Sequence, residues 1–311
     1  MSVDIIALGE PMVEFNQTGE RAGRLYLQGF GGDTSNAAIA AARQGARVAY
    51  VSAVGDDVYG RMLRELWDRE GVAHTDVRTD ADAFTAVYVV DHDERGHHFS
   101  FFRRGSAASR MRPQDLPADR IAGAKVLHLS GISAAISDSA CDTCFAAIAI
   151  ARKAGVMVSF DTNLRLKLWP LDRARAVIKA LIARCDICLP SFEDVAALSG
   201  LDHPDALVDW CLHLGARTVA LKLGERGALL AEGGRRMRLQ PHPCRPLDAT
   251  GAGDTFGGAL LARLVAGDAL EAAGRYASVA AALSTQGHGA VAPIPRSGQV
   301  RAALAAVTAA G

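Results

Sequence analysis

The sequence has no excess of charge of either sign, since 34 Lys and Arg residues balance 34 Asp and Glu residues among 311. A protein that binds nucleic acid or an anionic membrane through its overall field needs a basic excess, which is missing here. The stretch that contains Arg235, Arg236 and Arg238 is most simply explained as a solvated loop or strand edge. We therefore expect no nucleic-acid partner and no membrane partner.

Long hydrophobic runs are also missing. The apolar stretches that end at Arg152 and Arg263 span about two helical turns, well short of the ~20 residues that cross a bilayer. Residues 1–15 lack a basic region, and Asp4 and Glu10 interrupt their apolar pattern, which argues against a signal peptide. These features predict a cytoplasmic protein.

The six cysteines lack the arrangement of a zinc site. Cys141 and Cys144 fall in a helical pattern, whereas Cys185 and Cys188 fall in an extended one, where side chains three positions apart diverge. The two pairs are about forty residues apart, outside the usual spacing of a zinc ribbon. We predict reduced, mostly buried thiols and no zinc.

Two common nucleotide motifs are absent as well. The chain has no Gly-Lys dipeptide, which excludes a Walker A loop. Thr34 follows Gly29-x-Gly31, and Phe256 follows Gly251-x-Gly253, at the position where a dinucleotide-binding turn needs a small residue. A nucleotide site in this chain has to be built in another way.

What is present is an alternation of short apolar runs with Ala-rich helical patterns, typical of an α/β fold with a mainly parallel sheet. We expect a helix over residues 33–45, with Asp33, Thr34 or Ser35 as its cap and Gly45 at its end. A second helix ends at Gly71, and a long one starts near Asp254. The expected strands cover residues 4–10, 47–55, 124–131, 156–163, 185–191 and 218–224.

Residues 11–30 and 83–104 break this alternation, because they have strand and turn patterns with no helix between them. The charged run between Val90 and Phe99 is typical of a hairpin tip. We predict one domain over residues 1–311, with a small β lid built from about 11–30 and 83–104 that covers a cleft.

The strongest chemical signal is the segment DATGAGDTFGGALLARL, residues 248–264. Gly251, Ala252 and Gly253 are small enough for a phosphate to approach the backbone, directly before a helix whose free N–H groups and dipole attract an anion. Asp254 would lie beside that phosphate, where a carboxylate can take a proton from an attacking hydroxyl. The alternative is that Asp254 only caps the helix.

A second cluster, GFGGDTSNAA at residues 29–38, places Asp33 and Asn36 at a helix start. They offer donors and acceptors for sugar hydroxyls, although capping explains them equally well. Together the two clusters resemble the ribokinase and phosphofructokinase-B family of carbohydrate kinases. The matched positions are Asn36, Ala38, Gly45 and Gly55, then Asp248, Gly251 to Asp254, Gly258 and Ala259, with departures at Thr34 and Ala249.

Within that family the chain is most similar to the 2-keto-3-deoxygluconate kinases, through GEPMVEFN, GGDTSN, FFRRGSAAS, HLSGIS and DTNLRLKLW. The resemblance implies a ribokinase-like α/β fold and phosphorylation of 2-keto-3-deoxygluconate to its 6-phosphate by ATP with Mg²⁺. It leaves open a monovalent cation and a homo-oligomer formed through the β lid. The alternatives are a neutral-sugar kinase, such as a fructokinase or ribokinase, and a non-catalytic sugar or nucleotide sensor.

The resemblance also implies roles for individual residues. Asp254 is the base, beside the catalytic turn of Gly251, Ala252 and Gly253. The implied sugar site consists of Gly32, Asp33, Thr34, Ser35, Asn36, Tyr88, Phe101, Arg103 and Arg165. The implied nucleotide contacts are Asn163, Lys222, Gly224, Gly227, Gly251 and Gly253, near a loop at residues 287–293.

Two positions depart from the family pattern. Phe101 stands where relatives often carry Tyr, and the motif Asn-x-x-Glu is Ser191 to Asp194 here. The metal-support residues therefore stay open, with Asp194 acting through water as the candidate.

The inference that the substrate is a sugar acid rests on two arginines, Arg103 and Arg165. Arg165 follows an expected strand, and ligands of such sheets bind beyond the carboxyl ends of strands. A guanidinium is well shaped for a carboxylate. The plainer alternatives are that Arg165 pairs with Asp161 or Asp172, that Arg103 is a surface residue, and that Tyr88 only packs.

Overall fold

The computed structural model describes residues 3–18, 25–93 and 96–310. Its main sheet has the strand order β14-β13-β12-β11-β10-β9-β1-β4-β5, with β6 paired to β4. The strands from β12 to β5 pair in parallel, while β13 and β14 add an antiparallel edge. The bounds are β1 Ile5–Leu8, β4 Val48–Gly55, β5 Val72–Ala73, β6 Val77–Asp80, β9 Val126–Ser130, β10 Met157–Asp161, β11 Ile187–Cys188, β12 Thr218–Lys222, β13 Ala228–Glu232 and β14 Arg235–Leu239. The predicted α/β fold with a mainly parallel sheet is confirmed.

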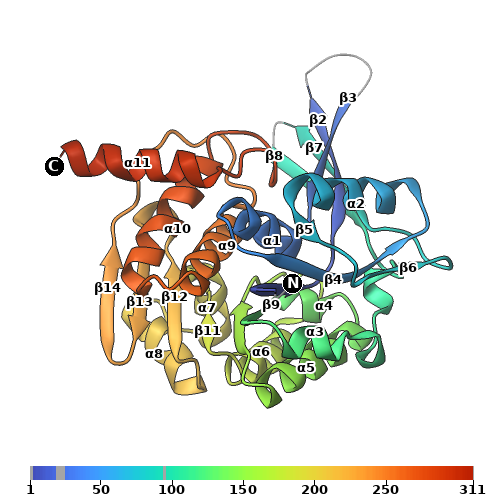
Figure 1. Ribbon diagram of the computed structural model, residues 1–311, viewed down its shortest axis with the longest axis horizontal. Helices are drawn as coiled ribbons and strands as arrows, with labels where there is room; N and C mark the ends of the chain where they lie inside the picture. Colours follow the sequence, from blue (N-terminus) through green and yellow to red (C-terminus); the bar gives the residue numbers. More distant parts are fainter. Residues whose placement is uncertain (1–2, 19–24, 94–95, 311) are drawn as a thin grey trace.

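Helices cover both faces of this sheet, as Figure 1 shows. Side chains alternate along the strands, so Ile6 and Leu8 of β1 enter one core while Ile5 and Ala7 enter the other. The first core is closed by α3 Ala118–Ala122, α4 Gly131–Ala135, α5 Asp138–Lys153, α6 Leu171–Ile182, α7 Phe192–Ser199 and α8 Pro204–Leu214. The second is closed by α1 Asp33–Arg43, α2 Val58–Glu70, α9 Ala252–Val265, α10 Leu270–Ser284 and α11 Ser297–Ala310.

A separate four-stranded sheet, with the order β3-β2-β7-β8, projects from this body (Figure 1). Its strands are β2 Met12–Thr18, β3 Leu25–Gly31, β7 Val87–Asp93 and β8 Gly96–Phe102. They come from the two predicted lid segments, of which residues 19–24 and 94–95 lie outside the described part. The predicted hairpin tip is too long, because strand pairing continues to Asp93 and resumes at Gly96.

The end of α2 follows the prediction, since Gly71 closes it in the left-handed conformation. The predicted cap of α1 is wrong. Its N-cap is Gly32, with a φ of 102° and no side-chain cap hydrogen bond. A Cβ at Gly32 would lie 2.3 Å from the carbonyl oxygen of Glu10, so only glycine lets the chain turn this close to the end of β1. Asp33 is thereby released from capping and becomes the first helical residue.

The predicted divergence of Cys185 and Cys188 is also wrong. Cys185 lies in the turn before β11, and the Cys188 thiol contacts the thiols of both Cys185 and Cys211, the latter on α8. Contacts with the other two thiols, together with burial, raise the pKa of Cys188 well above its usual value. All three thiols are buried and free. Within the described ranges, no three or more His, Cys, Asp or Glu side chains are arranged to hold a metal ion.

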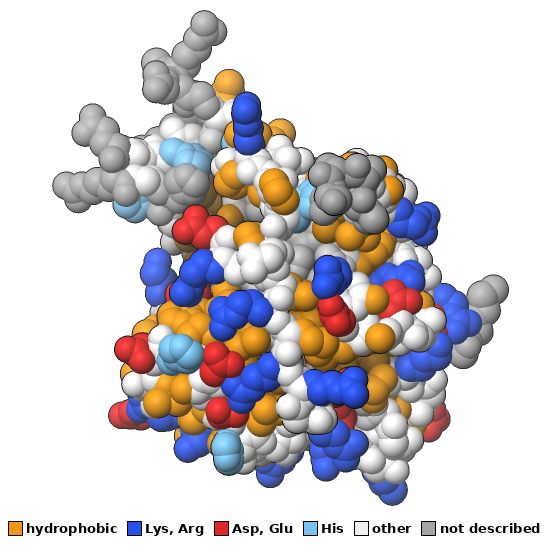
Figure 2. All heavy atoms as spheres, turned by 90° about the vertical axis from the view of Figure 1, so that its left-hand side faces the viewer, with side chains coloured by type: hydrophobic (Ala, Val, Ile, Leu, Met, Phe, Trp, Pro, Cys, Tyr) orange, Lys and Arg blue, Asp and Glu red, His pale blue; other side chains and the backbone are white. Residues whose placement is uncertain are grey.

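The Arg-rich segment is the edge strand β14, as expected of a strand edge. Arg236 donates to Asp205 at 2.7 Å and also pairs with Asp209. Figure 2, which faces the side of the molecule where β14 lies, shows acidic side chains interspersed among the basic ones. In the part of the chain that the structure covers, no helix combines the length and apolarity needed to cross a bilayer.

Candidate active site

Several charged side chains gather where parallel strands of the main sheet end. Glu10 follows β1, Asp161 ends β10 and Lys222 ends β12, while α1 and α9 both begin on this side. Carboxyl ends of parallel strands are the usual place for ligands in such sheets.

The turn before α9 is shaped by close backbone contact. Gly251 is the N-cap of α9, with a φ of 75°, and a Cβ there would lie 2.8 Å from the carbonyl oxygen of Ala290. No side chain caps this helix start. Asp254 therefore does not serve as the cap, which removes the plainer of its two interpretations. The first-turn N–H groups remain available to an anion.

Asp254 is held by a residue from the other end of the chain. Asn36 of α1 donates from Nδ2 to Oδ2 of Asp254 at 2.8 Å, across 218 positions. The two helices can approach this closely because a Cβ at Gly258 would lie only 2.2 Å from the carbonyl oxygen of Ala37. The sequence clusters 29–38 and 248–264 thus meet as one site.

The pKa of Asp254 is shifted toward neutrality. Burial, followed by the nearby carboxylate of Asp33, raises it to about 7, against the opposing effect of the hydrogen bond from Asn36. A carboxyl group with a pKa near the working pH is suited to exchange a proton with a substrate.

A cation lies beside the turn. Nζ of Lys222 donates to Oδ2 of Asp161 at 2.5 Å, and a Cβ at Gly253 would lie 3.5 Å from the same Nζ. Burial lowers the pKa of Lys222, but the carboxylates of Asp161, Asp254 and Asp194 outweigh it and raise the pKa overall. Lys222 is therefore charged.

Gly224 and Gly227 bound the short 3₁₀ turn Gly224–Arg226, which follows β12. Asp194 accepts a hydrogen bond from Thr162 Oγ1 at 3.0 Å, and burial raises the pKa of Asp194. The two glycines are thus close in the chain to Lys222, whereas Asp194 reaches the end of β10 from α7 through its bond with Thr162.

The start of α1 carries Asp33 and Asn36, which were predicted to contact the sugar. Asn163 donates from Nδ2 to Oδ2 of Asp33 at 2.8 Å, and its backbone is left-handed, with a φ of 29°. Asn163 was expected to contact nucleotide but here supports Asp33. Oδ1 of Asn36 is buried without a partner among the described residues, which suits it to accept a hydrogen bond from a ligand hydroxyl.

Thr34 and Ser35 are not brought into the site. The Thr34 hydroxyl lies 2.9 Å from the Tyr50 hydroxyl, and Trp67 donates to Ser35 Oγ at 3.0 Å. Both side chains are buried against the core. The helical period explains this, because positions one and two after Asp33 turn away from the face that Asp33 and Asn36 share.

Arg103 is held by a carboxylate that the sequence analysis did not assign. Its Nη2 donates to Oε2 of Glu10, whose side chain has no exposed surface, and Ser106 donates to Oε1 at 3.1 Å. Burial raises the pKa of Glu10, against the opposing charge of Arg103. The guanidinium carbon lies 5.5 Å from the Phe101 ring centre, and its Nε has no partner among the described residues. Arg103 is thus no free surface residue.

A second unassigned carboxylate, Glu14, accepts a hydrogen bond from the Tyr88 hydroxyl. Burial raises the pKa of Glu14. The Tyr88 ring stacks on Phe101 at 5.6 Å, so Tyr88 both packs and donates. The one signal for Glu10 and Glu14 in the sequence is their place as acids inside the apolar run at residues 5–15.

Arg165, unlike Arg103, is not paired with a carboxylate among the described residues. It is exposed, and it donates to the carbonyl of Leu164 at 2.8 Å. The two partners that the plainer interpretation offered are engaged elsewhere, Asp161 with Lys222 and Asp172 with Arg175. Its guanidinium is available at the rim beyond β10.

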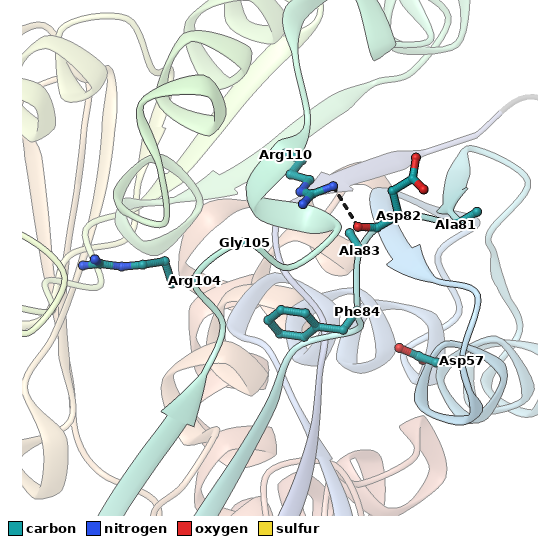
Figure 3. A pocket seen from close by; sticks show the side chains of 8 residues that line it. All are labelled: Asp57, Ala81, Asp82, Ala83, Phe84, Arg104, Gly105 and Arg110. Carbon is teal, nitrogen blue, oxygen red and sulfur yellow. Dashed lines mark hydrogen bonds between the residues drawn. The ribbon is translucent and has the colours of Figure 1, made fainter.

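A cavity of about 570 Å³ lies elsewhere (Figure 3). Two of its polar side chains bond within the protein, since Arg110 donates to the Asp82 carbonyl and Asp57 accepts from Gly60 and Thr85. In Figure 3, Arg104 extends away from the other lining side chains. None of the predicted site residues lines it, so the cluster around Asp254 is the candidate site. The lining residues are Asp57, Ala81, Asp82, Ala83, Phe84, Arg104, Gly105 and Arg110.

Comparison with known proteins agrees with this geometry. A family model described as pfkB family carbohydrate kinase matches residues 3–297. The chain is 32% identical to the probable fructokinase-4 of Arabidopsis thaliana, over 96% of each chain. It is 31% identical to the 2-dehydro-3-deoxygluconokinase of Thermoproteus tenax, over 85% of this chain and 83% of the relative.

Among solved structures, a fructokinase double mutant from Vibrio cholerae O395, in a form with bound fructose, ADP and potassium ion, superposes with a TM-score of 0.88. The identity is 28%, and the match covers 97% of this chain and 99% of that one. The expected ribokinase-like fold is confirmed. The relatives do not favour a keto-acid over fructose. The chain belongs to the pfkB family of carbohydrate kinases, and it is an ATP-dependent sugar kinase.

Proposed function

We propose that this kinase phosphorylates 2-keto-3-deoxygluconate to its 6-phosphate, with Asp254 as the base. The observation that carries the catalytic part is the state of Asp254. It lies at the first turn of α9, it is not used as a cap, Asn36 orients it, and its pKa is raised to about 7.

The proposed reaction uses these groups directly. The attacking hydroxyl gives its proton to a carboxylate oxygen of Asp254 while its oxygen bonds to the γ-phosphorus of ATP, and ADP leaves with the electron pair of the broken P–O bond. The first-turn N–H groups after Gly251, together with Lys222 beside Gly253, stabilise the charge on the phosphoryl oxygens. Asn36 keeps Asp254 directed at the sugar.

Magnesium fits this site as a companion of the nucleotide. Mg²⁺ usually binds through one or two carboxylates and phosphate oxygens and keeps several waters. Asp194 offers such a carboxylate near Lys222, and we propose that it supports the ion through water. When bound, Mg²⁺ neutralises charge on the terminal phosphates. A monovalent cation is also proposed, because the related fructokinase carries potassium.

The acid-sugar part rests on Arg165. Its exposed guanidinium lies at the carboxyl end of β10 and is not paired with Asp161 or Asp172. A carboxylate on the substrate would supply the bidentate partner that this side chain lacks. The 2-dehydro-3-deoxygluconokinase among the relatives supports the same substrate class.

A neutral sugar such as fructose is the second candidate. The observation that favours it is the pairing of Arg103 with buried Glu10, which leaves one guanidinium fewer for a substrate carboxylate. The fructokinases among the relatives support it as well.

One substrate panel tests the proposal. ADP release is measured with Mg²⁺–ATP against 2-keto-3-deoxygluconate, 2-keto-3-deoxygalactonate, fructose and ribose. We expect the keto-acids to exceed the neutral sugars in kcat/KM by about a hundred-fold, the upper worth of one charged hydrogen bond. If fructose is phosphorylated as efficiently, the acid-sugar proposal fails and the neutral-sugar candidate replaces it.

We also propose that the lid forms a homo-oligomer. Its strands β3 and β8 carry apolar side chains with large exposed fractions, among them Leu25 at 67% and Phe102 at 57%. Clustered apolar surface of this kind is typical of association sites. Light scattering of Leu25→Lys beside the unchanged protein tests it, because a lid interface would be weakened by the charge.

A further inference from the structure

The turn that precedes α9 is backed by a second segment of chain. Asp248 accepts from the N–H groups of Thr250 and Gly289, both at 2.9 Å, and so joins the turn to residues 287–296. Ala290 touches Gly251 closely enough to exclude a Cβ there. A shift of Gly289 or Ala290 would therefore act on Gly251, the residue that starts the proposed phosphate turn.

The far side of this segment is held by the last turn of α1. Arg43 donates from Nη1 to the carbonyl of Val291 at 3.1 Å and to that of Ile294. The adjacent Gln44 donates to the carbonyl of Pro295 at 2.8 Å. Residues 287–296 lie between α10 and α11 and form neither helix nor strand. The bonds from Arg43 and Gln44 therefore pair backbone carbonyls that no helix or sheet pairs.

Arg43 is itself fixed by α2. Nε and Nη2 of Arg43 donate to the two carboxylate oxygens of Glu70, each at 2.8 Å. Both side chains are only 9% exposed. The bond from Arg43, followed by burial in the opposite sense, leaves the pKa of Glu70 lowered, so the carboxylate is ionised. A bidentate, shielded pair of this kind holds the third guanidinium nitrogen in one direction.

We infer that Arg43 is a positioning residue for the phosphate-binding turn, acting through residues 287–296. The inference rests on the proposed role of that turn. The two ends of α1 then act on the site in different ways. Asn36 in the first turn orients Asp254, and Arg43 in the last turn holds the segment that packs against Gly251. Figure 1 shows α1 beside α9, the helix that both ends serve.

The test compares Arg43→Met with Arg47→Met. Arg47 makes an equally bidentate pair with Asp4, at 2.9 and 2.8 Å, but within the described ranges it forms no hydrogen bond with residues 287–296. We expect Arg43→Met to raise the KM for ATP and the Kd for ADP, measured by calorimetry, by about tenfold or more, as when a charged hydrogen bond is lost. The KM for the sugar should stay within about twofold, because Asn36 and Asp33 are held by α9 and Asn163. Arg47→Met should leave all three constants unchanged.

A double variant covers the case in which Arg43→Met does not fold because Glu70 is left buried with only Arg296, at 3.6 Å, as a charged partner. Arg43→Met with Glu70→Gln should regain stability while ADP binding stays weak. Amide hydrogen exchange should become faster at residues 287–296 in both Arg43 variants and not in Arg47→Met. Unchanged ADP affinity in a folded Arg43 variant, or equal weakening in Arg47→Met, overturns the inference while leaving the kinase function intact. Failure of the unchanged protein to bind ADP would instead refute the proposed turn.

Discussion

The proposed phosphate turn and the floor of the proposed sugar site are built in different ways. The turn is made of backbone, since Gly251, Ala252 and Gly253 expose N–H groups at a helix start and Asp254 follows them directly. The floor is made of side chains from distant elements whose polar groups bond to one another: Arg103 pairs with Glu10, and the Tyr88 hydroxyl donates to Glu14. The difference teaches that a ligand can bind the N–H groups of the turn without breaking a hydrogen bond of the protein. On the sugar floor a ligand must either compete with the existing hydrogen bonds or use polar atoms that have no partner among the described residues.

The largest effect is expected at Asp254. Asp254→Asn should lower kcat by roughly 10²–10⁴-fold, the usual worth of a positioned base, while ADP binding stays nearly unchanged. Steady-state turnover and calorimetry with ADP measure the two quantities. Full turnover in the variant would remove Asp254 as the base.

The stability of Asp254→Asn shows whether a loss of turnover comes from misfolding. Because the pKa of Asp254 is raised to about 7, the folded protein binds this proton more tightly than the unfolded chain does. Stability from this group is present at low pH and is lost as pH rises from the usual carboxyl range through about 7. Asp254→Asn should therefore be no less stable than the unchanged protein at pH 8.

On the sugar floor, Arg103→Leu is expected to act mainly on stability. It would leave Glu10 buried and unpaired, which costs about 3–5 kcal/mol for a broken buried pair. Thermal unfolding measures the loss, and Arg103→Leu with Glu10→Gln should recover most of it. If the single variant is as stable as the unchanged protein and only its KM for the sugar changes, the main role of Arg103 is to bind substrate and not to neutralise Glu10.

Arg165→Leu is expected to change activity rather than stability. Among the described residues its guanidinium bonds to no other side chain, so we expect unchanged stability. We also expect a ten- to hundred-fold fall in kcat/KM for the keto-acid alone, about the worth of one charged hydrogen bond. Activity on fructose is the matched readout. An equal fall with both sugars would show that Arg165 does not read the carboxylate.

The smallest effect is expected from Gly253→Ala. A Cβ there meets Lys222 at an ordinary contact distance of 3.5 Å, so the protein should fold normally. The methyl group would nevertheless stand where a phosphate approaches, and we expect roughly tenfold weaker ATP binding, or ~1.4 kcal/mol. Gly251→Ala is the contrast, since strain at its φ of 75° and contact with Ala290 should lower stability first. Equal nucleotide affinity in Gly253→Ala would mean that the phosphate lies elsewhere.

This contrast also explains how much of the molecule could be predicted from the sequence. The inner parallel strands, the lid and the turn at Gly251 to Asp254 could be predicted, because each depends on local periodicity or on small residues that are neighbours in the chain. The short strands β5 and β6 and the antiparallel edge of β13 and β14 were not predicted. The pairing of Arg103 with Glu10 could not, since it joins positions 93 apart whose approach is set by the lid. The cap of α1 failed for a similar reason, because Gly32 is required by the distant carbonyl of Glu10.

The convergence of Cys188 with Cys211 was missed in the same way, because the strand β11 is only two residues long and Cys185 lies before it. An extended pattern of seven residues was assumed where the backbone turns. Residue patterns therefore predicted elements well and contacts between elements poorly.

The most direct test of the account is the pH dependence of kcat/KM in the unchanged protein and in Asp254→Asn. With a base whose pKa is about 7, activity should fall as pH drops below that value, approaching tenfold per pH unit, because the protonated carboxyl cannot accept the substrate proton. The residual activity of Asp254→Asn should lack this acid limb. A flat profile between about pH 5.5 and 8 in the unchanged protein, or the same acid limb in the Asn variant, would contradict the assignment of Asp254 as the base.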